Sequence, residues 1–460
     1  MLEKLFKLQE NKTTVKTEIL AGITTFMTMA YILAVNPNIL AAAGMDQGAV
    51  FTATVIASFL GTICMALFAN YPFALAPGMG LNAYFAYTVC GNMGYSWQVA
   101  LAAVLIEGLI FILLSVTNVR EAIFNAIPRN LKTAVSVGIG LFIAFIGLQN
   151  AKIVISGPTL VQIFSLDGYN QINGVTASMQ DVGITVLLAI IGVIITAIMV
   201  VKNVKGNILW GILITWLLGI ICQFTGLYVP NPELGMFSLL PDFSAGLNVP
   251  SIAPIFAKFS FDGVKFGELL IVVFSFLFVD LFDTLGTLIG VSSKAGMLDK
   301  DGKLPNIKGA LMADAVATTA GAVLGTSTVT TFVESASGVS EGGRTGLTAV
   351  TTAILFGLSL FLSPIFLAIP AFATAPALII VGFYMLSNVI NIDFEDYTEG
   401  IPCFICIAAM PFFYSISEGI SMGIISYVAI HLISGKAKEK KMSALMIVLA
   451  ILFVLKYILM

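Results

Sequence analysis

The chain has 460 residues, of which 58% are hydrophobic and only 10% are charged, and its formal net charge is −3. Its mean hydropathy is +1.00. Soluble domains carry roughly 25% charged residues, so this composition excludes an ordinary soluble protein. Repeated stretches of about 18 to 22 apolar residues match helices that cross a hydrocarbon layer roughly 30 Å thick. The sequence therefore predicts an all-α polytopic protein of the cytoplasmic membrane.

Fourteen spans are predicted in chain order. The third and tenth contain APGMGLNA and TSTVTTFVESASG, which are short and interrupted by Gly and Pro or by Thr and Ser. Each of these two is expected to be extended backbone that leads into a half-helix. The predicted spans cover residues 19–40, 49–70, 71–90, 97–117, 132–150, 180–201, 206–223, 269–291, 308–325, 326–340, 344–364, 368–388, 400–415 and 418–435.

The distribution of Lys and Arg predicts the orientation of the chain. With a cytoplasmic N-terminus, eighteen of the 22 basic residues fall on the cytoplasmic side, and only Lys152, Lys258 and Lys265 fall outside. This asymmetry is what the positive-inside rule expects. The remaining one, Lys456, lies in an apolar tail over residues 442–460, which could be a further span or an interfacial helix.

The order of the spans indicates an inverted repeat. Seven spans precede a long external segment at about residues 227–267 and seven follow it, so the second half crosses the membrane in the opposite sense. The two interrupted segments are each third in their own half. Corresponding interruptions in two inverted halves indicate a binding site near the middle of the membrane, where half-helix ends can meet a ligand.

Three carboxyl groups lie in this predicted site region. Asp280 and Asp283 are three residues apart in an apolar span and share one helix face, and Glu334 follows the Thr-rich start of the second interrupted segment. Acids in a membrane are costly and usually functional. Because no Lys or Arg lies deep inside any predicted span, a cation must balance them, and H⁺ is the simplest one. A purely structural hydrogen-bonding role is the alternative.

Other polar residues have less specific interpretations. Asp314 is expected to lie behind the site and to tie the ninth span to the acid-bearing helices, and Glu107 to make a structural hydrogen bond between helices. His431 is expected to reach toward the membrane interface. The amide of Asn82 could pair with a polar solute or cap the half-helix that contains it. The five cysteines are expected to pack in the core, so no metal and no cofactor are predicted.

Four sequence segments resemble a known family. They are AGITTFMTMAYILAVNP in the first span, LAPGMGLNAYFAYTV in the third, FVDLFDTLGTLIG in the eighth and GTSTVTTFVESASGVSEGGRTGLTAV in and after the tenth. The chain resembles the adenine/guanine/hypoxanthine permease family of the nucleobase/cation symporter-2 superfamily, over essentially its whole length.

The resemblance implies two inverted seven-span repeats, with short antiparallel strands in spans three and ten. It implies a core domain (1–118 and 269–364), a gate domain (119–226 and 365–435), an external connecting segment (227–268) and a basic loop with an apolar tail (436–460). A homodimer is frequent in proteins of this kind. By motif, Asp283 and Glu334 would hold the base and couple to protons, and Asp280 and Asn82 match further polar positions of the family.

The chemistry of a purine agrees with this assignment. A purine is a flat ring with N–H donors and carbonyl or imine acceptors at its edge, so a site should offer carboxylate acceptors, backbone donors and an apolar face. Phe26 or Phe332 could lie against the ring, although core packing is equally open for both. Carboxylates would come from Asp283 and Glu334, and backbone donors from the residues around Gly80 and Ser335.

The sequence thus predicts a proton-coupled importer of purine nucleobases that works by alternating access and contacts lipid but no nucleic acid. A Na⁺-coupled nucleobase carrier is an alternative. An anion transporter of the same architecture is a second alternative. Such a transporter would need a basic residue at the half-helix ends, but acids occupy that site here. A membrane enzyme is not expected, because no span carries a metal-ligand cluster or a nucleophile with its base.

Overall fold

The computed structural model describes residues 2–116, 127–157, 160–244, 246–294, 296–297, 304–437, 439 and 442–459. Among these residues, ten helices are long and apolar enough to cross a membrane. The predicted helical, multi-pass architecture is confirmed at this level. The other segments predicted to span, the third, eighth, tenth and thirteenth, correspond to α5 with η1, to α12, to α14 and to α18. The predicted domain boundary at residues 118 and 119 lies outside the described residues.

The helices and strands of the first half alternate between long apolar helices and short connecting elements. They are α1 (Leu2–Phe6), α2 (Val15–Met29), α3 (Ile32–Ala41), α4 (Gln47–Phe68), β1 (Leu75–Pro77), α5 (Met79–Ala83), η1 (Tyr84–Asn92), α6 (Trp97–Val116), α8 (Arg129–Asn150), β2 (Val154–Ser156), β3 (Val161–Ile163), α9 (Leu166–Asn173), η2 (Met179–Gly183), α10 (Ile184–Val201) and α11 (Asn207–Phe224).

The second half follows a largely irregular segment that contains only one short described helix, η3 (Pro232–Leu234). Its elements are α12 (Phe266–Lys294), α13 (Ile307–Leu324), β4 (Val329–Thr331), α14 (Ser335–Ser340), α15 (Gly346–Leu358), η4 (Ser359–Leu362), α16 (Ser363–Leu367), α17 (Ala371–Leu386), η5 (Ser387–Asn391), α18 (Tyr397–Phe412), α19 (Ile416–Ile433) and α20 (Ala444–Leu459).

The ends of the long helices follow local sequence rules. Asp46 precedes α4, and its carboxylate accepts a hydrogen bond from the backbone N–H of Ala49 at 2.7 Å. This satisfies one of the N–H groups that a helix start leaves unpaired. At the other end of a helix, α13 stops at Gly325, whose φ of +96° suits a residue without a Cβ.

The first predicted span is a helix in two parts. α2 ends at Met29 and α3 begins at Ile32, with Ala30 and Tyr31 between them. Pro37 lies inside α3 and has no N–H, so it cannot complete the hydrogen bond to the carbonyl four residues before it. Tyr31 lies at this break, and its hydroxyl donates a hydrogen bond to Glu334 of the second interrupted segment.

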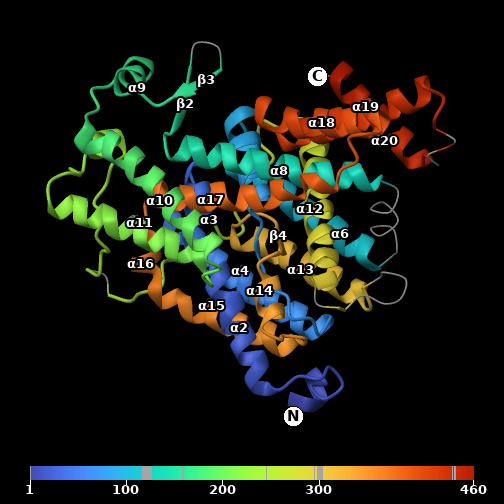
Figure 1. Cartoon of the computed structure of the whole chain (residues 1–460), viewed down its shortest axis with the longest axis horizontal. Coiled ribbons are helices and arrows are strands. Elements are labelled where there is room, and N and C mark those ends of the chain that lie inside the picture. The colour runs from blue at the N-terminus through green and yellow to red at the C-terminus, as the bar shows by residue number, and fades with distance from the viewer. Residues whose placement is uncertain are drawn as a thin grey trace.

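The structure contains a further pair of strands besides those expected in spans three and ten. A second antiparallel pair, β2 with β3, lies in the loop between α8 and α10, with Ile155 opposite Gln162. Figure 1 shows this pair beside α9, away from the helical body. Strands of three residues in a connecting loop leave no apolar run or long alternation in the sequence, so they could not be predicted from it.

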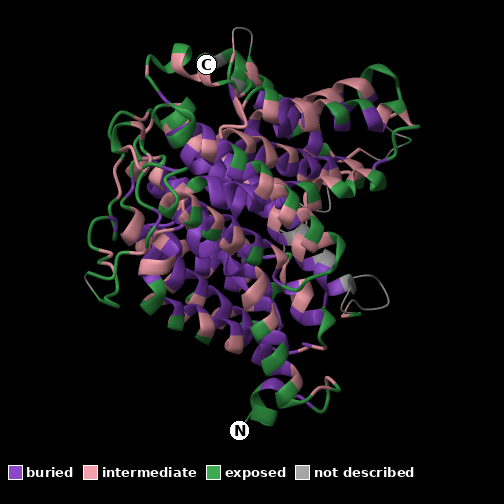
Figure 2. Ribbon diagram, turned by 60° about the vertical axis from the view of Figure 1, so that its left-hand side comes forward, coloured by how far each residue is buried: buried purple, intermediate pink, exposed green. Residues whose placement is uncertain are grey.

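The surface of α10 is typical of a helix that faces lipid. Large apolar side chains three or four residues apart are exposed along it, and this spacing places them on one side of a helix. They are Leu187, Ile190, Ile194, Ile198 and Val201. Buried residues concentrate in the middle of the molecule instead (Figure 2).

The helices pack in two sets. In one set, α13 contacts both α4 and α6; α3 and α15 pack on α4, α12 packs on α6, and α2 packs on α15 and α14. In the other, α8 packs against α17 and α18, while α10 and α11 pack on α17. Figure 1 shows α10 and α11 at one side of the second set and α18 and α19 at the other.

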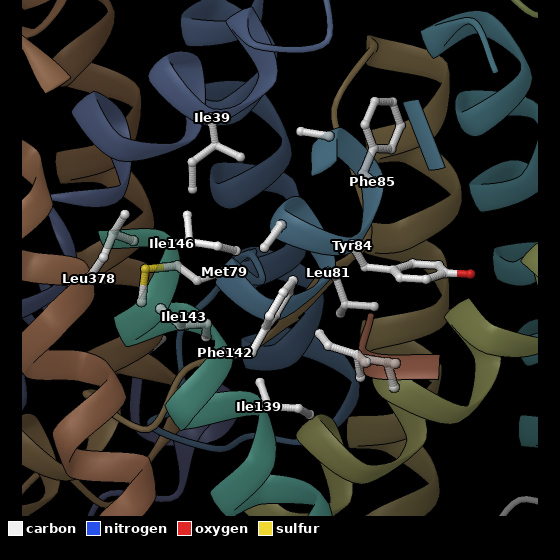
Figure 3. Packing of buried hydrophobic residues seen from close by; sticks show 14 of the residues in the cluster. Ile39, Met79, Leu81, Tyr84, Phe85, Ile139, Phe142, Ile143, Ile146 and Leu378 are labelled. Carbon is white, nitrogen blue, oxygen red and sulfur yellow. The ribbon is translucent and has the colours of Figure 1, made fainter. Parts of the chain in front are cut away.

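The two sets meet at α5. Met79 of α5 lies among Ile143 and Ile146 of α8 and Leu378 of α17, as Figure 3 shows. A Cβ placed on Gly80 would lie only 2.9 Å from Cγ2 of Ile139 on α8. The helix that follows β1 is therefore in close apolar contact with the second set.

The apolar tail forms α20, which packs against α19. The Tyr457 hydroxyl of α20 donates a hydrogen bond to Glu418 and lies 2.6 Å from the hydroxyl of Ser421 on α19. Phe453 of α20 contacts Phe274 of α12 at 5.9 Å between ring centroids. The tail, left open by the sequence, is thus a helix that contacts one member of each set.

We predict that Gly382→Ala destabilises the contact between α17 and α8. A Cβ at Gly382 would lie 2.5 Å from the carbonyl oxygen of Gly140, which is backbone and cannot rotate away. Overpacking of this kind costs about 1–3 kcal/mol, so the midpoint of thermal unfolding in detergent should fall. The matched control is Gly267→Ala, because a Cβ there would meet nothing within 4 Å. Equal midpoints for the two variants would contradict the prediction.

Candidate functional site

The two interrupted segments meet as a pair of antiparallel strands. β1 pairs with β4, with Leu75 opposite Thr331, Ala76 opposite Thr330 and Pro77 opposite Val329. Each strand continues into a short helix, α5 or α14. The predicted strands, their antiparallel pairing and the half-helices that follow them are confirmed. Pairing satisfies backbone groups that the interior of a membrane protein could not leave open.

The backbone bonds that flank the strands are the same on both sides. The N–H of Gly78, just after β1, donates to the carbonyl of Thr328, just before β4, at 3.0 Å. The N–H of Phe332, just after β4, donates to the carbonyl of Ala74, just before β1, also at 3.0 Å. The crossing therefore has an approximate two-fold relation in its main-chain contacts.

Two buried threonines support the strands in the same equivalent way. The Thr62 hydroxyl of α4 donates to the carbonyl of Leu75 at 3.1 Å and accepts from its N–H at 2.9 Å. The Thr318 hydroxyl of α13 donates to the carbonyl of Val329 at 2.9 Å and accepts from its N–H at 3.3 Å. Each threonine thus takes up both polar groups of the first residue of a strand.

Glu334 lies immediately before α14 and is held by a tyrosine. The Tyr31 hydroxyl donates a hydrogen bond of 2.6 Å to Oε1 of Glu334. Tyr31 lies at the break between α2 and α3, so the first predicted span reaches the second interrupted segment. The sequence analysis missed Tyr31, because an aromatic residue in an apolar span gives no signal that distinguishes a site from the core.

Asp283 of α12 lies next to the strand crossing. It interacts electrostatically with Glu334 and with Asp314, and Tyr31 interacts electrostatically with both Glu334 and Asp283. A Cβ placed on Gly78 would lie 3.4 Å from Oδ2 of Asp283. Asp283 therefore lies beside the end of β1, within electrostatic range of Glu334 and Tyr31.

Asp280 faces a different group of residues from Asp283. Its Oδ1 is 2.7 Å from the hydroxyl of Thr284, one turn further along α12. The same hydroxyl is 2.8 Å from Oδ1 of Asp314 on α13 and 2.8 Å from the hydroxyl of Thr330 on β4. Asp314 thus makes the contact with the acid-bearing helix that the sequence suggested. Thr284 was missed, although its position four residues after Asp280 was a usable signal.

Two predicted site residues have structural partners. The hydroxyl of Ser327 donates to Oδ1 of Asn82, and Nδ2 of Asn82 donates to the carbonyl of Pro77 at 3.4 Å. The Oγ of Ser335 accepts from the N–H of Ala74 at 3.0 Å, and its own N–H donates to the carbonyl of Phe332. Each residue ties one half-helix to the residues just before the strand of the other half.

The two aromatic residues predicted to face a base, Phe26 and Phe332, lie in different environments. Phe26 of α2 makes an edge-to-face contact with Phe356 of α15, with 5.3 Å between ring centroids. Phe332 is buried directly after β4. In this arrangement Phe26 therefore has the packing role that was open for it, and Phe332 lies two residues from Glu334.

His431 does not reach the membrane interface as expected. It is fully buried, with Nδ1 2.9 Å from the carbonyl oxygen of Tyr427 and its ring stacked on the Tyr427 ring at 4.0 Å. Its Nε2 lies 3.8 Å from Oε1 of Glu399 on α18. A buried acid on the neighbouring helix, which the sequence could not place, explains why the histidine turns inward.

Glu107 makes a structural hydrogen bond to the second interrupted segment. Its Oε2 accepts from the hydroxyl of Thr328 at 2.7 Å. It therefore holds the segment that leads into β4.

Comparison with known proteins identifies the family. Residues 16–422 match the Permease family. The chain belongs to this permease family. It is 50% identical to a Methanocaldococcus jannaschii protein named as a permease, over 99% of this chain and 98% of that one. It is 46% identical to the guanine/hypoxanthine permease PbuO of Bacillus subtilis (98% of each chain) and 41% identical to the adenine permease AdeP of Escherichia coli (100% and 96%).

The permease also shares its fold with solved structures of distant transporters. The transmembrane domain of a cyanobacterial bicarbonate transporter, BicA, aligns with a TM-score of 0.59 at 17% identity, over 90% of the permease and 97% of that chain. Murine Slc26a9, an anion transporter in the inward-facing state, aligns with a TM-score of 0.62 at 11% identity, over 91% and 68%. Identities this low show a common fold alone. As a permease the protein is a transporter and not an enzyme.

We predict that Thr318→Val lowers the stability of the permease, because it leaves the buried N–H and carbonyl of Val329 without their hydroxyl partner. An unsatisfied buried polar group costs about 1–3 kcal/mol. Thermal unfolding in detergent should show a lower midpoint for Thr318→Val and a nearly unchanged one for Thr318→Ser, which keeps the hydroxyl. Thr62→Val should behave like Thr318→Val. A neutral effect of both valine variants would show that the hydroxyls do not support the strands.

Proposed function

We propose that the protein imports purine nucleobases across the cytoplasmic membrane, coupled to H⁺. One observation carries the proposal. Two acids from separate parts of the chain, Asp283 and Glu334, are neighbours at the crossing of two interrupted segments, in a chain 40–46% identical to adenine and guanine/hypoxanthine permeases. Carboxylates at this place are suited to accept N–H groups from the edge of a purine.

The proposed site has donors and apolar surfaces to complete the recognition. The proposed contacts of the base are Asp283, Glu334, Asn82, Gly80, Ser335, Phe26 and Phe332. Gly80 is close to Ile139 of α8, and the N–H of Ser335 is bonded within its own turn. Contact of a base with the backbone of Gly80 therefore requires the two sets of helices to separate, which alternating access would supply. The N–H of Ser335 would have to exchange its bond to Phe332 for one to the base.

The two sets of helices suggest how the permease moves. We assign the set around α4 and α13 to a core domain (1–118 and 269–364) and the set around α8 and α17 to a gate domain (119–226 and 365–435). The segments 227–268 and 436–460 lie outside both domains. The equivalent bonds of Gly78 and Phe332, and of Thr62 and Thr318, support a fourteen-span fold of two inverted repeats. Rocking of the core against the gate would carry the site from one side to the other.

Proton coupling is proposed because the site region is acidic and deep in the membrane. Asp280, Asp283 and Glu334 are the proposed coupling residues, with Asp314 behind them. Coupling to Na⁺ is the alternative, and the transport assay below distinguishes the two. The proposed orientation has a cytoplasmic N-terminus, and a homodimer is the proposed assembly.

We predict that cells lacking their own purine carriers, when they express this protein, accumulate labelled adenine, guanine or hypoxanthine. A protonophore should abolish accumulation at constant external Na⁺, while replacing Na⁺ by choline should not. Loss on Na⁺ removal together with resistance to the protonophore would instead support the Na⁺-coupled carrier. Uptake of none of the three bases, with the protein present in the membrane, would defeat the proposed substrate class.

We predict that a change at Glu334 and a change at its partner Tyr31 alter purine uptake to different degrees. Glu334→Ala should lower uptake at least about tenfold, because a hydrogen bond to a charged group contributes about 1.5–3 kcal/mol. Tyr31→Phe should change KM more than maximal rate, since it alters the group that positions Glu334. The matched control is Tyr71→Phe, because Tyr71 is also buried but its hydroxyl has no hydrogen-bond partner among the described residues. Full activity of Glu334→Ala would remove its assigned role.

A further inference from the structure

One hydroxyl in the permease touches more oxygens than it can donate to. Oγ1 of Thr284 lies 2.7 Å from Oδ1 of Asp280, 2.8 Å from Oδ1 of Asp314 and 2.8 Å from the hydroxyl of Thr330. All three distances are normal for hydrogen bonds between oxygens. Thr284, Asp280 and Asp314 are fully buried and Thr330 is 1% exposed, so bulk water does not compete for these contacts.

Counting the hydrogens fixes the protonation of this group. A threonine hydroxyl has one hydrogen to donate, whereas an ionised carboxylate only accepts. Thr284 can therefore donate to one aspartate, and it can accept from Thr330. The contact with the other aspartate is then a hydrogen bond only if that carboxyl is protonated and donates to Thr284. If Thr284 donates to Thr330 instead, both aspartates must be protonated.

The group connects three elements that form the site. Asp280 and Thr284 belong to α12, Asp314 to α13, and Thr330 to β4, where it lies opposite Ala76 of β1. Asp283, the residue before Thr284, interacts electrostatically with Asp314 and Glu334. A change in the protonation of the group is therefore felt both by the strand crossing and by an acid of the proposed purine site.

We propose that Thr284 is a positioning residue that holds one proton between Asp280 and Asp314, and that this proton is the one carried with the substrate. The inference rests on the proposed proton-coupled transport and names where its proton is held. When the proton leaves for water on the cytoplasmic side, two carboxylates share a single hydroxyl hydrogen. One of the two aspartate contacts is then lost. If Thr284 keeps its bond to Asp280, α13 is no longer tied to α12 through Asp314, while Thr330 of β4 can still donate to Thr284. Asp283 and Glu334 remain available to bind the base.

Asparagine at position 314 provides the main test. Its amide can donate to Thr284 as a protonated aspartate does, but it cannot release a proton. In proteoliposomes, Asp314→Asn should still exchange labelled for unlabelled purine while losing accumulation driven by a pH gradient. Accumulation like that of the unmodified protein would overturn the proposal. Absence of purine exchange in the unmodified protein would instead overturn the proposed function.

Changes at Thr284 test the hydroxyl itself. Thr284→Val, which has nearly the same shape, should lower gradient-driven accumulation about tenfold, the effect of losing a hydrogen bond to a charged group. Thr284→Ser should restore it. Thr319→Val is the matched control, because the Thr319 hydroxyl donates only to the carbonyl of Ala315 in its own helix. Equal accumulation by the valine and serine variants at position 284 would contradict the assigned role.

An infrared measurement tests the proton without transport. The purified permease at neutral pH should show the carbonyl band of a protonated carboxyl group, and Asp314→Asn or Thr284→Val should shift or remove it. If the band is absent from the unmodified protein, the proton is not there and the proposal fails. The infrared band also reports whether the carboxyl group is protonated in a variant that folds but does not transport.

Discussion

The structure depends on satisfying backbone hydrogen bonds where two spans are interrupted inside the membrane. Hydrocarbon offers no partner for an open N–H or carbonyl group, so the extended residues of one segment must bond to those of the other. β1 and β4 do this, and Thr62 and Thr318 take up the polar groups at the first residue of each strand. Because each strand leads directly into a short helix, the same pairing fixes where both half-helices begin.

The acids are arranged in two groups by this crossing. Asp283 and Glu334 lie with Tyr31 near the end of β1, whereas Asp280 and Asp314 share the hydroxyl of Thr284 behind β4. Two residues three positions apart on one helix therefore have different surroundings. Such a division allows one pair of acids to recognise a base while the other pair holds a proton, as we propose.

Much of the site could be anticipated from residue types and spacing, but not its internal contacts. The Gly, Pro, Thr and Ser residues of the interrupted segments predicted extended backbone, and acids in apolar spans predicted functional groups. Asn82 and Ser335 were expected near a ligand, yet each bonds to the segment just before the strand of the other half. His431 was expected at the interface and lies buried against Tyr427 and Glu399. Some of these partners are more than twenty residues away in the sequence, and others depend on which side of a helix faces inward. A local sequence pattern contains neither kind of information.

Hydropathy, breaker residues and motifs are properties of short segments, so the multi-pass helical class, the places where helices are interrupted and the family can all be read from the amino-acid sequence. The bond of Tyr31 to Glu334, the contacts of Thr284 with Asp280 and Asp314, and the packing of α20 on α19 and α12 emerge only from the folded molecule. The physical reason is that a hydrogen bond or a packed ring pair depends on distances of a few ångströms between segments far apart in the chain, and those distances exist only once the helices have packed.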